Sequence, residues 1–240
     1  QTCALPISVI GSAFYIMSME EGRVFWDPTL PSQEPDARRK IFTSKIETLA
    51  KLHILDPEKI GLGDFGKPGN YFARQVDRWT KQYRASETEH LPEMEKLIEW
   101  LPRTLPAQQR VSIVHGDYRL DNMIFHATEP RVIAVLDWEL STLGDPMADF
   151  TYLLMQWTMP GLANADLKAL NIPSQDEAAQ IYCNVTGMAV PDLNWYFSYN
   201  LFRLAGITQG IAGRVRDGTA ANAKALESAA RTVPLSKASW

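Results

Sequence analysis

One short stretch of the sequence, residues 115–122, gathers polar side chains that could do chemistry. His115, Asp117, Arg119, Asp121 and Asn122 lie within this stretch, and apolar residues flank it on both sides. A carboxylate can orient a hydroxyl group and accept its proton, and nearby carboxylate or amide oxygens can hold a hard cation such as Mg²⁺. The stretch is therefore a candidate catalytic loop between two buried segments.

The spacing of three groups matches a known phosphoryl-transfer site. Protein kinases place the base Asp and a Mg²⁺-binding Asn in one loop as Asp-x-x-x-x-Asn, and a second Mg²⁺-binding Asp follows after a hairpin. Asp117 and Asn122 have this spacing, and Asp137 directly follows the apolar residues 131–136. A His-Gly-Asp triplet is otherwise commonly a simple turn. The added Asn122 and the segment VIAVLDWE favour the catalytic interpretation.

The elements expected around this loop are short strands and helices. Residues 111–114 predict a strand before the loop, and residues 122–125 and 131–136 predict a hairpin after it. An apolar run at residues 13–17 predicts another strand. Apolar residues at helical spacing predict helices over residues 36–53, 70–86, 91–101, 147–158, 174–187, 192–216 and 220–230. The β patch that carries the polar cluster thus lies between two groups of helices.

Bulk properties exclude several classes of protein. The 240 residues suffice for one large domain, or a domain plus part of another. The net charge of −4 argues against a nucleic-acid binder. No apolar run approaches the roughly 20 residues of a membrane span. Cys3 and Cys183 form no disulfide framework or metal-ligand spacing, so a cytoplasmic setting is expected.

The segments HGDYRLDN and VLDWELSTLGDPMADF resemble the signature of the aminoglycoside phosphotransferase and choline kinase-like superfamily. Three more segments resemble one branch, the kinase-like domains of acyl-CoA dehydrogenase family members 10 and 11: FYIMSMEEGRVFWDPTLP, LGDFGKPGNYFARQVDRWTKQYRASET and NLFRLAGITQGIAGRV. The resemblance covers residues 9–240. It implies an α+β, protein-kinase-like fold, mostly the helical C-terminal lobe with a remnant of the β N-lobe. It also implies ATP and Mg²⁺ as cofactors and a small-molecule hydroxyl as phosphoryl acceptor.

Roles for single residues follow from the resemblance. Asp117 resembles the catalytic base, and Asn122 and Asp137 resemble the magnesium ligands. His115 resembles a histidine that supports the loop, and Asp149 the buried acid that ties the loop to the next helix. The segment Met17, Ser18 and Met19 resembles the nucleotide hinge, although Ser18 departs from the acidic residue common there.

Residues 1–7, QTCALPI, match the translation of a common sequencing-adapter read and are expected to be a non-native segment. The resemblance implies that residues 8–22 are the N-lobe remnant and hinge and that residues 23–240 are the C-terminal lobe. The first lysine is Lys40, and no glycine-rich loop precedes Tyr15. The kinase parts that grip the α- and β-phosphates are then missing. We therefore expect an N-terminally truncated chain that binds ATP poorly and turns over little.

Basic residues suggest an anionic acceptor. Between residues 67 and 84 the sequence has one acidic residue, Asp77, and five basic residues, Lys67, Arg74, Arg78, Lys81 and Arg84. Such an excess of positive charge attracts anions. Arg74, Arg78 and Lys81 share one helical face, although a merely solvated face is an equal alternative. Arg203 lies on a later helix with Gly206, Gly210 and Gly213, which predict close approach of a partner helix or a ligand. The resemblance implies a hydroxyacyl-CoA-like acceptor and fusion to, or association with, an acyl-CoA dehydrogenase.

Other interpretations stay open. They are an aminoglycoside-type antibiotic kinase, a non-catalytic kinase-like binding domain, and a hydrolase with paired Asp117 and Asp137, which would leave Asn122 unexplained. Residues 61–66 fit G-x-G-x-x-G, but they follow a helix-like stretch and predict a surface loop. His115 and His126 are expected to be independent, and His53 and His90, at helix ends, are expected to be solvated.

Overall fold

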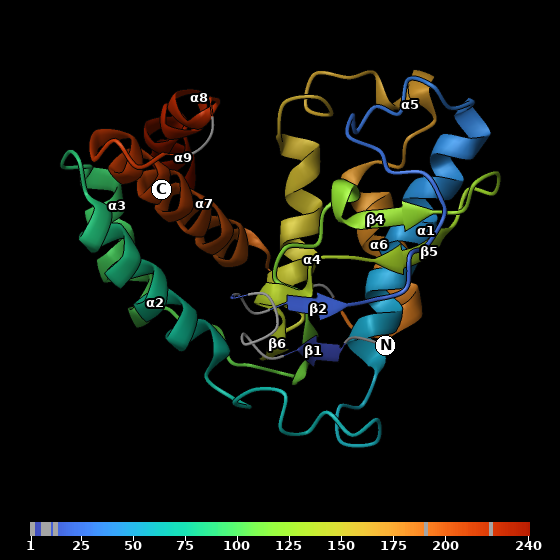
Figure 1. Ribbon diagram of the computed structural model, residues 1–240, viewed down its shortest axis with the longest axis horizontal. Helices are drawn as coiled ribbons and strands as arrows, with labels where there is room; N and C mark the ends of the chain where they lie inside the picture. The colour runs from blue at the N-terminus through green and yellow to red at the C-terminus, as the bar shows by residue number, and fades with distance from the viewer. Residues whose placement is uncertain (1–2, 6–10, 12–13, 190–191, 221–222) are drawn as a thin grey trace.

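A computed structural model describes residues 3–5, 11, 14–189, 192–220 and 223–240. Most of these residues are helical (Figure 1). The helices are α1 (Pro35–Ile54), α2 (Tyr71–Ser86), α3 (Pro92–Trp100), α4 (Met147–Leu154), α5 (Leu167–Leu170), α6 (Gln175–Thr186), α7 (Asn194–Arg216), α8 (Ala225–Ala229) and α9 (Thr232–Ser239). The strands are β1 (Cys3–Leu5), β2 (Phe14–Ile16), β3 (Ser112–Val114), β4 (Met123–Phe125), β5 (Val132–Val135) and β6 (Thr142–Gly144). Short 3₁₀ turns are η1 (Leu101–Arg103), η2 (Leu120–Asn122), η3 (Trp138–Leu140) and η4 (Met155–Thr158).

The four central strands form two nested antiparallel pairs. The inner strands β4 and β5 pair as a hairpin, with Met123 opposite Val135. The outer strands β3 and β6 pair with each other, with Ser112 opposite Gly144. Nesting leaves two connections, residues 115–122 and residues 136–141, at the same end of the strands. Residues that are distant in sequence are thereby brought to one place.

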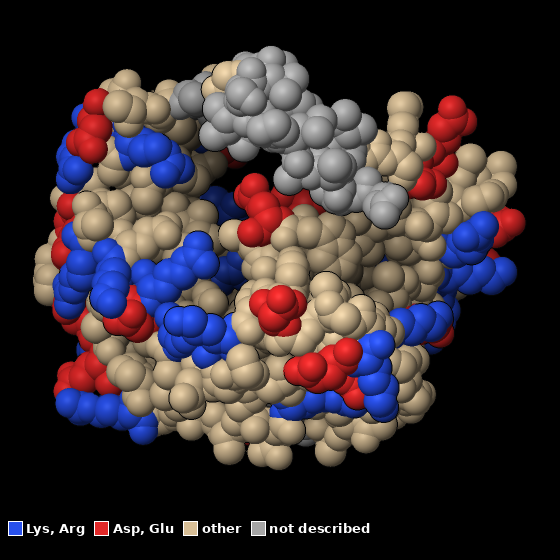
Figure 2. All heavy atoms as spheres, turned by 60° about the horizontal axis from the view of Figure 1, so that its bottom comes forward, with Lys and Arg blue, Asp and Glu red and all other residues tan. Residues whose placement is uncertain are grey.

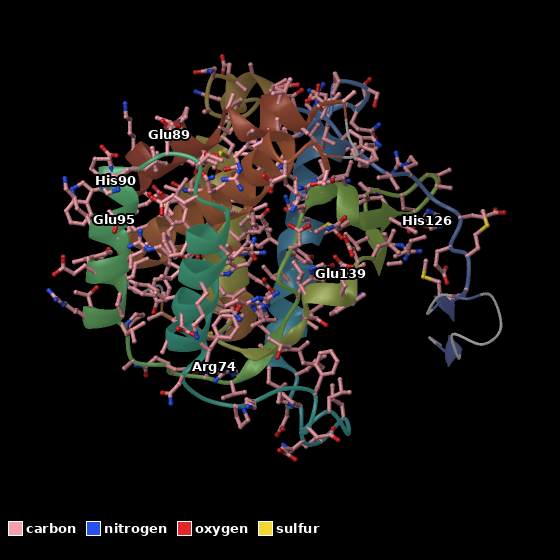
Figure 3. The ribbon with its side chains drawn as sticks, turned by 60° about the vertical axis from the view of Figure 1, so that its left-hand side comes forward. Arg74, Glu89, His90, Glu95, His126 and Glu139 are labelled. Carbon is pink, nitrogen blue, oxygen red and sulfur yellow. The ribbon has the colours of Figure 1, made fainter. Side chains whose placement is uncertain are left out.

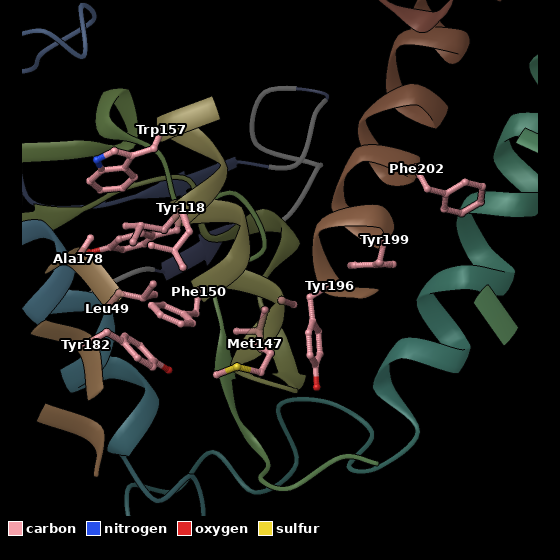
Figure 4. Close-up of a cluster of buried hydrophobic side chains, with 14 of the residues drawn as sticks. Leu49, Tyr118, Met147, Phe150, Trp157, Ala178, Tyr182, Tyr196, Tyr199 and Phe202 are labelled. Carbon is pink, nitrogen blue, oxygen red and sulfur yellow. The ribbon is translucent and has the colours of Figure 1, made fainter. Parts of the chain in front are cut away.

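A core of aromatic and aliphatic side chains holds the strands against α1, α4 and α6. Figure 4 shows Leu49, Phe150 and Tyr182 within it. The rings of Phe150 and Tyr182 stack with their centroids 3.9 Å apart. Full burial of one such side chain contributes roughly 1.5–3 kcal/mol. Helix α6 begins with a capping box in which Ser174 and Glu177 satisfy each other's backbone N–H groups.

A second group of helices, α2, α3, α7, α8 and α9, lies on the other side of α4 (Figure 1). Helix α7 meets α2 along its glycines: a Cβ on Gly213 would lie 3.2 Å from the Cβ of Ser86, and one on Gly206 would lie 3.8 Å from the Trp79 ring. Gln209 donates a hydrogen bond to Thr88 Oγ1 over 2.9 Å beside this contact. The glycines therefore serve helix packing, one of the two interpretations left open by the sequence.

Most predicted elements agree with the structure. The strand before the loop, the hairpin, and the helices over residues 36–53, 70–86, 91–101, 147–158, 174–187 and 192–216 are confirmed within a few residues. The prediction over residues 220–230 is too long, since only Ala225–Ala229 are helical and residues 221–222 lie outside the described residues. The sequence analysis missed α5, α9 and β6.

The domain boundaries at residues 7 and 22 stay predictions. Of the segment expected to be non-native, residues 1–2 and 6–7 lie outside the described residues, and Cys3–Leu5 pair with Phe14–Ile16 as an antiparallel ribbon. Among the described residues, no helix is long and apolar enough to cross a membrane.

Candidate active site

The two connections at the end of the nested strands bind each other through main-chain groups. The Leu136 N–H donates to the Asn122 carbonyl over 2.8 Å, and His115 Nε2 lies 2.8 Å from the Leu136 carbonyl oxygen. Gly116 has a left-handed φ of 87°, and a Cβ there would lie 2.8 Å from the Leu140 carbonyl oxygen. Residues 115–122 and 136–141 therefore form one unit, and glycine permits their close approach.

The carboxylate of Asp117 is held from two sides. Asn122 Nδ2 donates to Asp117 Oδ2 over 3.2 Å and to the Asp117 carbonyl over 2.9 Å. Tyr152 Oη donates to Asp117 Oδ1 over 3.0 Å. Burial, followed by the charge of Asp117, raises the pKa of Tyr152 to about 12, so this phenol stays a proton donor. Asp117 is thus oriented by neutral groups and can still accept a proton.

Two hard oxygen donors adjoin this carboxylate. Because Asn122 uses its Nδ2 on Asp117, its Oδ1 remains available. Asp137 has left-handed backbone angles, φ 64° and ψ 58°, and its exposed carboxylate bonds to none of the described residues. It follows Leu136, whose N–H contacts Asn122. Amide and carboxylate oxygens are what Mg²⁺ prefers, so the residues present fit that ion.

Asp149 on α4 anchors the start of the catalytic loop. Its carboxylate accepts the backbone N–H of His115 over 2.5 Å and that of Gly116 over 2.9 Å. His53 Nε2 lies 3.5 Å away. Burial alone would raise the pKa of Asp149, but His53 and the two N–H donors hold it below its usual value. The anchor is therefore ionised, as its acceptor role requires.

The expectation that His53 is solvated is wrong. Its side chain is 0% exposed, and its Nδ1 lies 2.7 Å from Tyr182 Oη. The end of α1 is buried under α6, which its polar sequence ending did not reveal. His90 is exposed, as expected. His126 lies on the far hairpin turn (Figure 3), where its Nδ1 accepts the backbone N–H of Glu129 over 3.0 Å.

The four predicted substrate residues fall into two groups. Arg74 donates to the Lys67 carbonyl over 2.7 Å and also to that of Gly69, so it braces the loop before α2. Lys81 pairs with Asp77 over 2.8 Å on the surface. Arg78 and Arg203 instead line a common pocket of about 200 Å³. Figure 2 shows Lys and Arg side chains gathered beside a hollow on this face.

Arg203 also supports the catalytic loop. It donates a hydrogen bond to the Gly116 carbonyl, and its guanidinium lies 5.2 Å from the centroid of the Tyr152 ring and 5.6 Å from that of Trp79. Tyr152 itself was missed in the sequence. A signal existed, because Tyr152 lies three residues after Asp149 and therefore on the same face of α4.

A groove of about 430 Å³ runs along the other side of the catalytic loop. Its walls include Arg119 and Asp121 of the loop, Tyr152 and Met155 after it, and Trp26 from the segment before α1. The walls therefore combine polar side chains with apolar ones such as Leu153, Met155 and Met159. Such a groove fits a small amphiphilic molecule better than a polycation.

The predicted hinge segment follows β2 at the surface. Met17 and Met19 are exposed, Met19 to 88%, and Ser18 Oγ donates to Glu20 Oε1 over 3.2 Å. The chain then joins the hairpin, since Arg23 and Phe125 exchange two backbone hydrogen bonds of 2.8 Å. The loop over residues 61–66 contacts β6, where a Cβ on Gly66 would lie 2.8 Å from the Leu143 nitrogen.

Comparisons with known proteins agree with this geometry. A family model described as "Phosphotransferase enzyme family" matches residues 3–179. Acyl-CoA dehydrogenase family member 10 of Mus musculus is 43% identical over 97% of this chain and 22% of its own length. The chain spans between about a fifth and a third of the curated relatives that it matches.

Solved structures give the same fold. A crystal structure from Ralstonia eutropha, assigned to the aminoglycoside phosphotransferases, superposes with a TM-score of 0.92 at 49% identity, covering 100% of this chain and 76% of that one. LicA, a choline kinase of Streptococcus pneumoniae solved with AMP, has a TM-score of 0.56 at 14% identity, covering 99% and 73%. At that identity it supports the fold alone. The protein-kinase-like fold expected from the sequence is confirmed, and the chain belongs to the phosphotransferase enzyme family.

Proposed function

We propose that this chain carries the catalytic loop of an ATP-dependent O-phosphotransferase that acts on a small-molecule alcohol. The observation that supports this most strongly is the arrangement of Asp117, oriented by Asn122 and Tyr152, beside the free oxygens of Asn122 and Asp137. Base and metal ligands of this kind, at this spacing, are the parts that phosphoryl transfer needs. A hydrolase with paired carboxylates would have no use for Asn122.

The proposed step follows from those positions. Asp117 accepts a hydrogen bond from the acceptor hydroxyl and takes its proton as the oxygen bonds to the γ-phosphorus. The bond between that phosphorus and the bridging oxygen of ATP breaks, and ADP leaves. Asn122 and Asp137 would hold Mg²⁺, which when bound neutralises charge on the nucleotide phosphates. Tyr152 keeps Asp117 in place throughout.

The proposed acceptor is a hydroxyacyl-CoA-like molecule. Two observations support it: the relatives include acyl-CoA dehydrogenase family members, and the groove beside Tyr152 combines polar and apolar walls. In the whole gene product, the domain is proposed to be fused to, or to associate with, such a dehydrogenase. The predicted hinge, Met17 to Met19, would contact adenine through its backbone.

A second candidate is an aminoglycoside-type antibiotic kinase. It is favoured by the Ralstonia relative, which was assigned to that group. Aminoglycosides are polycations, whereas Arg78 and Arg203 outnumber Glu139 in the pocket beside Gly116. This excess of cations disfavours an aminoglycoside.

A transfer assay with radiolabelled ATP tests the proposal on the full-length gene product. The acceptor panel contains hydroxyacyl-CoA thioesters with the hydroxyl at different carbons, their free hydroxy acids and kanamycin, each with and without Mg²⁺. We expect phosphoryl transfer to the hydroxyacyl compounds, only in the presence of Mg²⁺, and no transfer to kanamycin. Nucleotide binding without transfer to any acceptor would instead support a non-catalytic binding domain.

A further inference from the structure

Arg203 is a buried cation without a carboxylate partner. It belongs to α7, and the residue is buried, with only 7% of its surface exposed. It donates a hydrogen bond to the Gly116 carbonyl, and its guanidinium lies near the rings of Trp79 and Tyr152. No described carboxylate forms an ion pair with it, although the charge of Asp117 also acts on it. Since a buried charge is costly unless it is paired, an anion bound beside Arg203 would be stabilised.

An opening beside Arg203 can admit that anion. The pocket of about 200 Å³ lies between α2, α7 and residues 139–142, and its walls include Arg78, Arg203, Trp79, Gln75, Ser141 and Glu139. Both guanidinium groups approach the same indole, Arg78 at 5.4 Å and Arg203 at 5.6 Å from the Trp79 ring centroid. Two cations thus converge on one wall.

A hydroxyl group in the same wall is also unpartnered. Ser141 Oγ is buried, and among the described residues it has no hydrogen-bond partner. Buried polar atoms are nearly always satisfied, so an exception calls for an explanation. A ligand oxygen in the pocket would satisfy it. Glu139 contributes one negative charge to the walls, which leaves a net charge of +1 from Arg78, Arg203 and Glu139.

The pocket differs from the rest of the basic face. Arg74 and Lys81 already have partners, in loop carbonyls and in Asp77, whereas Arg78 has no hydrogen bond or ion pair with a described residue. The pocket also touches Gly116, the residue directly before Asp117. An anion bound here therefore lies close to the carboxylate that is proposed to receive the acceptor hydroxyl.

We infer that this pocket binds an oxyanion of the phosphoryl acceptor, a carboxylate or a phosphate, and thereby directs the acceptor hydroxyl toward Asp117. The inference rests on the proposed function in one respect, that the bound molecule is the phosphoryl acceptor. The affinity of the pocket for an oxyanion does not depend on turnover. The oxyanion has two chemical sources, the carboxylate of a hydroxy acid or the phosphates of coenzyme A.

Equilibrium titration of the 240-residue chain tests the inference without nucleotide. The probes are 4-hydroxybutyrate, its neutral counterpart 1,4-butanediol, and coenzyme A. The variants are Arg78→Gln, which removes an exposed cation from the pocket, and Ser141→Ala. The matched control is Arg84→Gln, which removes the same charge from the same helix at a side chain paired with Glu95. Thermal unfolding of each variant checks that the fold is intact.

The expected result is that an anionic probe binds, that the diol does not, and that Arg78→Gln raises the dissociation constant at least about tenfold, the effect of losing a charge-assisted hydrogen bond. Arg84→Gln should leave it unchanged. Binding of 4-hydroxybutyrate would identify the carboxylate as the source, and binding of coenzyme A alone would identify its phosphates.

The inference is overturned if neither anion binds, if the diol binds equally well, or if Arg78→Gln and Arg84→Gln weaken binding to the same degree. Asp117→Asn separates the two proposals, because it should abolish transfer and leave probe binding at its original strength.

Discussion

The phenol of Tyr152 donates a hydrogen bond to Oδ1 of Asp117 over 3.0 Å, from the same face of α4 that carries Asp149. One helix therefore fixes both the start of the catalytic loop and the direction of its central carboxylate. This arrangement links the packing of α4 in the core to the chemistry of the loop.

Replacing Tyr152 by Phe removes the donor and keeps the ring. Hydrogen bonds to a charged group contribute about 1.5–3 kcal/mol, and part of that should appear as a fall in kcat of about tenfold, with the KM for ATP unchanged. Steady-state kinetics of the full-length gene product measures both constants. Tyr196→Phe, at a buried ring in the same helical lobe, should change neither; an unchanged kcat in Tyr152→Phe would show that Asp117 does not need this contact.

Replacing Asp149 by Asn should loosen the catalytic loop. Asn keeps the size but loses the charge that accepts two backbone N–H groups and faces His53. The free energy of unfolding should fall by about 2–4 kcal/mol, measured by urea titration at pH 7. Because the pKa of Asp149 is held below its usual 3.8, the wild type loses this contribution as the pH falls below that value, and the two proteins should converge there.

Position 116 requires glycine for two reasons, its left-handed φ of 87° and the lack of space for a side chain beside Leu140. Gly116→Ala should cost about 1–3 kcal/mol of stability from backbone strain, and more from the contact with Leu140. Gly218→Ala is the matched control, since its φ is 68° and a Cβ there meets nothing within 4 Å. Equal losses in the two variants, measured by urea titration, would mean that the Leu140 contact is unimportant.

Lys45 should make stability depend on pH. It is buried in α1, and burial lowers its pKa to about 7, although Asp121 acts in the opposite direction. The unfolded chain therefore binds the additional proton between pH 7 and about 10.5, and stability should rise with pH across that range by up to about 1.4 kcal/mol per pH unit. Lys45→Met should flatten this rise. The check is a series of urea titrations from pH 6 to 10, and an equal slope in both proteins would contradict the assignment.

The catalytic loop could be predicted because its parts are close in sequence. Asp117 and Asn122 lie in one loop, and the hairpin that returns the chain to Asp137 has a clear strand-turn-strand pattern. The nesting of β3 and β6 around this hairpin was not predicted, because the residues 142–144 are too few to show alternation.

The residues that support the loop were harder to find. His53 reaches Asp149 from 96 positions away, and Arg203 reaches Gly116 from 87 positions away. Periodicity shows which face of a helix is buried but not which other element it meets. For the same reason the sequence grouped Arg78 with Arg74 and Lys81, and only the structure distinguishes the pocket from the braced residues.

The most direct measurement for the central claim is phosphoryl transfer by Asp117→Asn in the full-length gene product, with nucleotide affinity measured in parallel. Asn keeps the size of the side chain and can still accept a hydrogen bond from Tyr152, but it cannot take the acceptor proton. The account predicts a fall in kcat of at least about 100-fold, since general base catalysis contributes typically 10²–10⁴-fold, with unchanged Mg·ATP affinity. Asp137→Ala should weaken Mg·ATP binding as well. Transfer at the wild-type rate in Asp117→Asn would contradict the account.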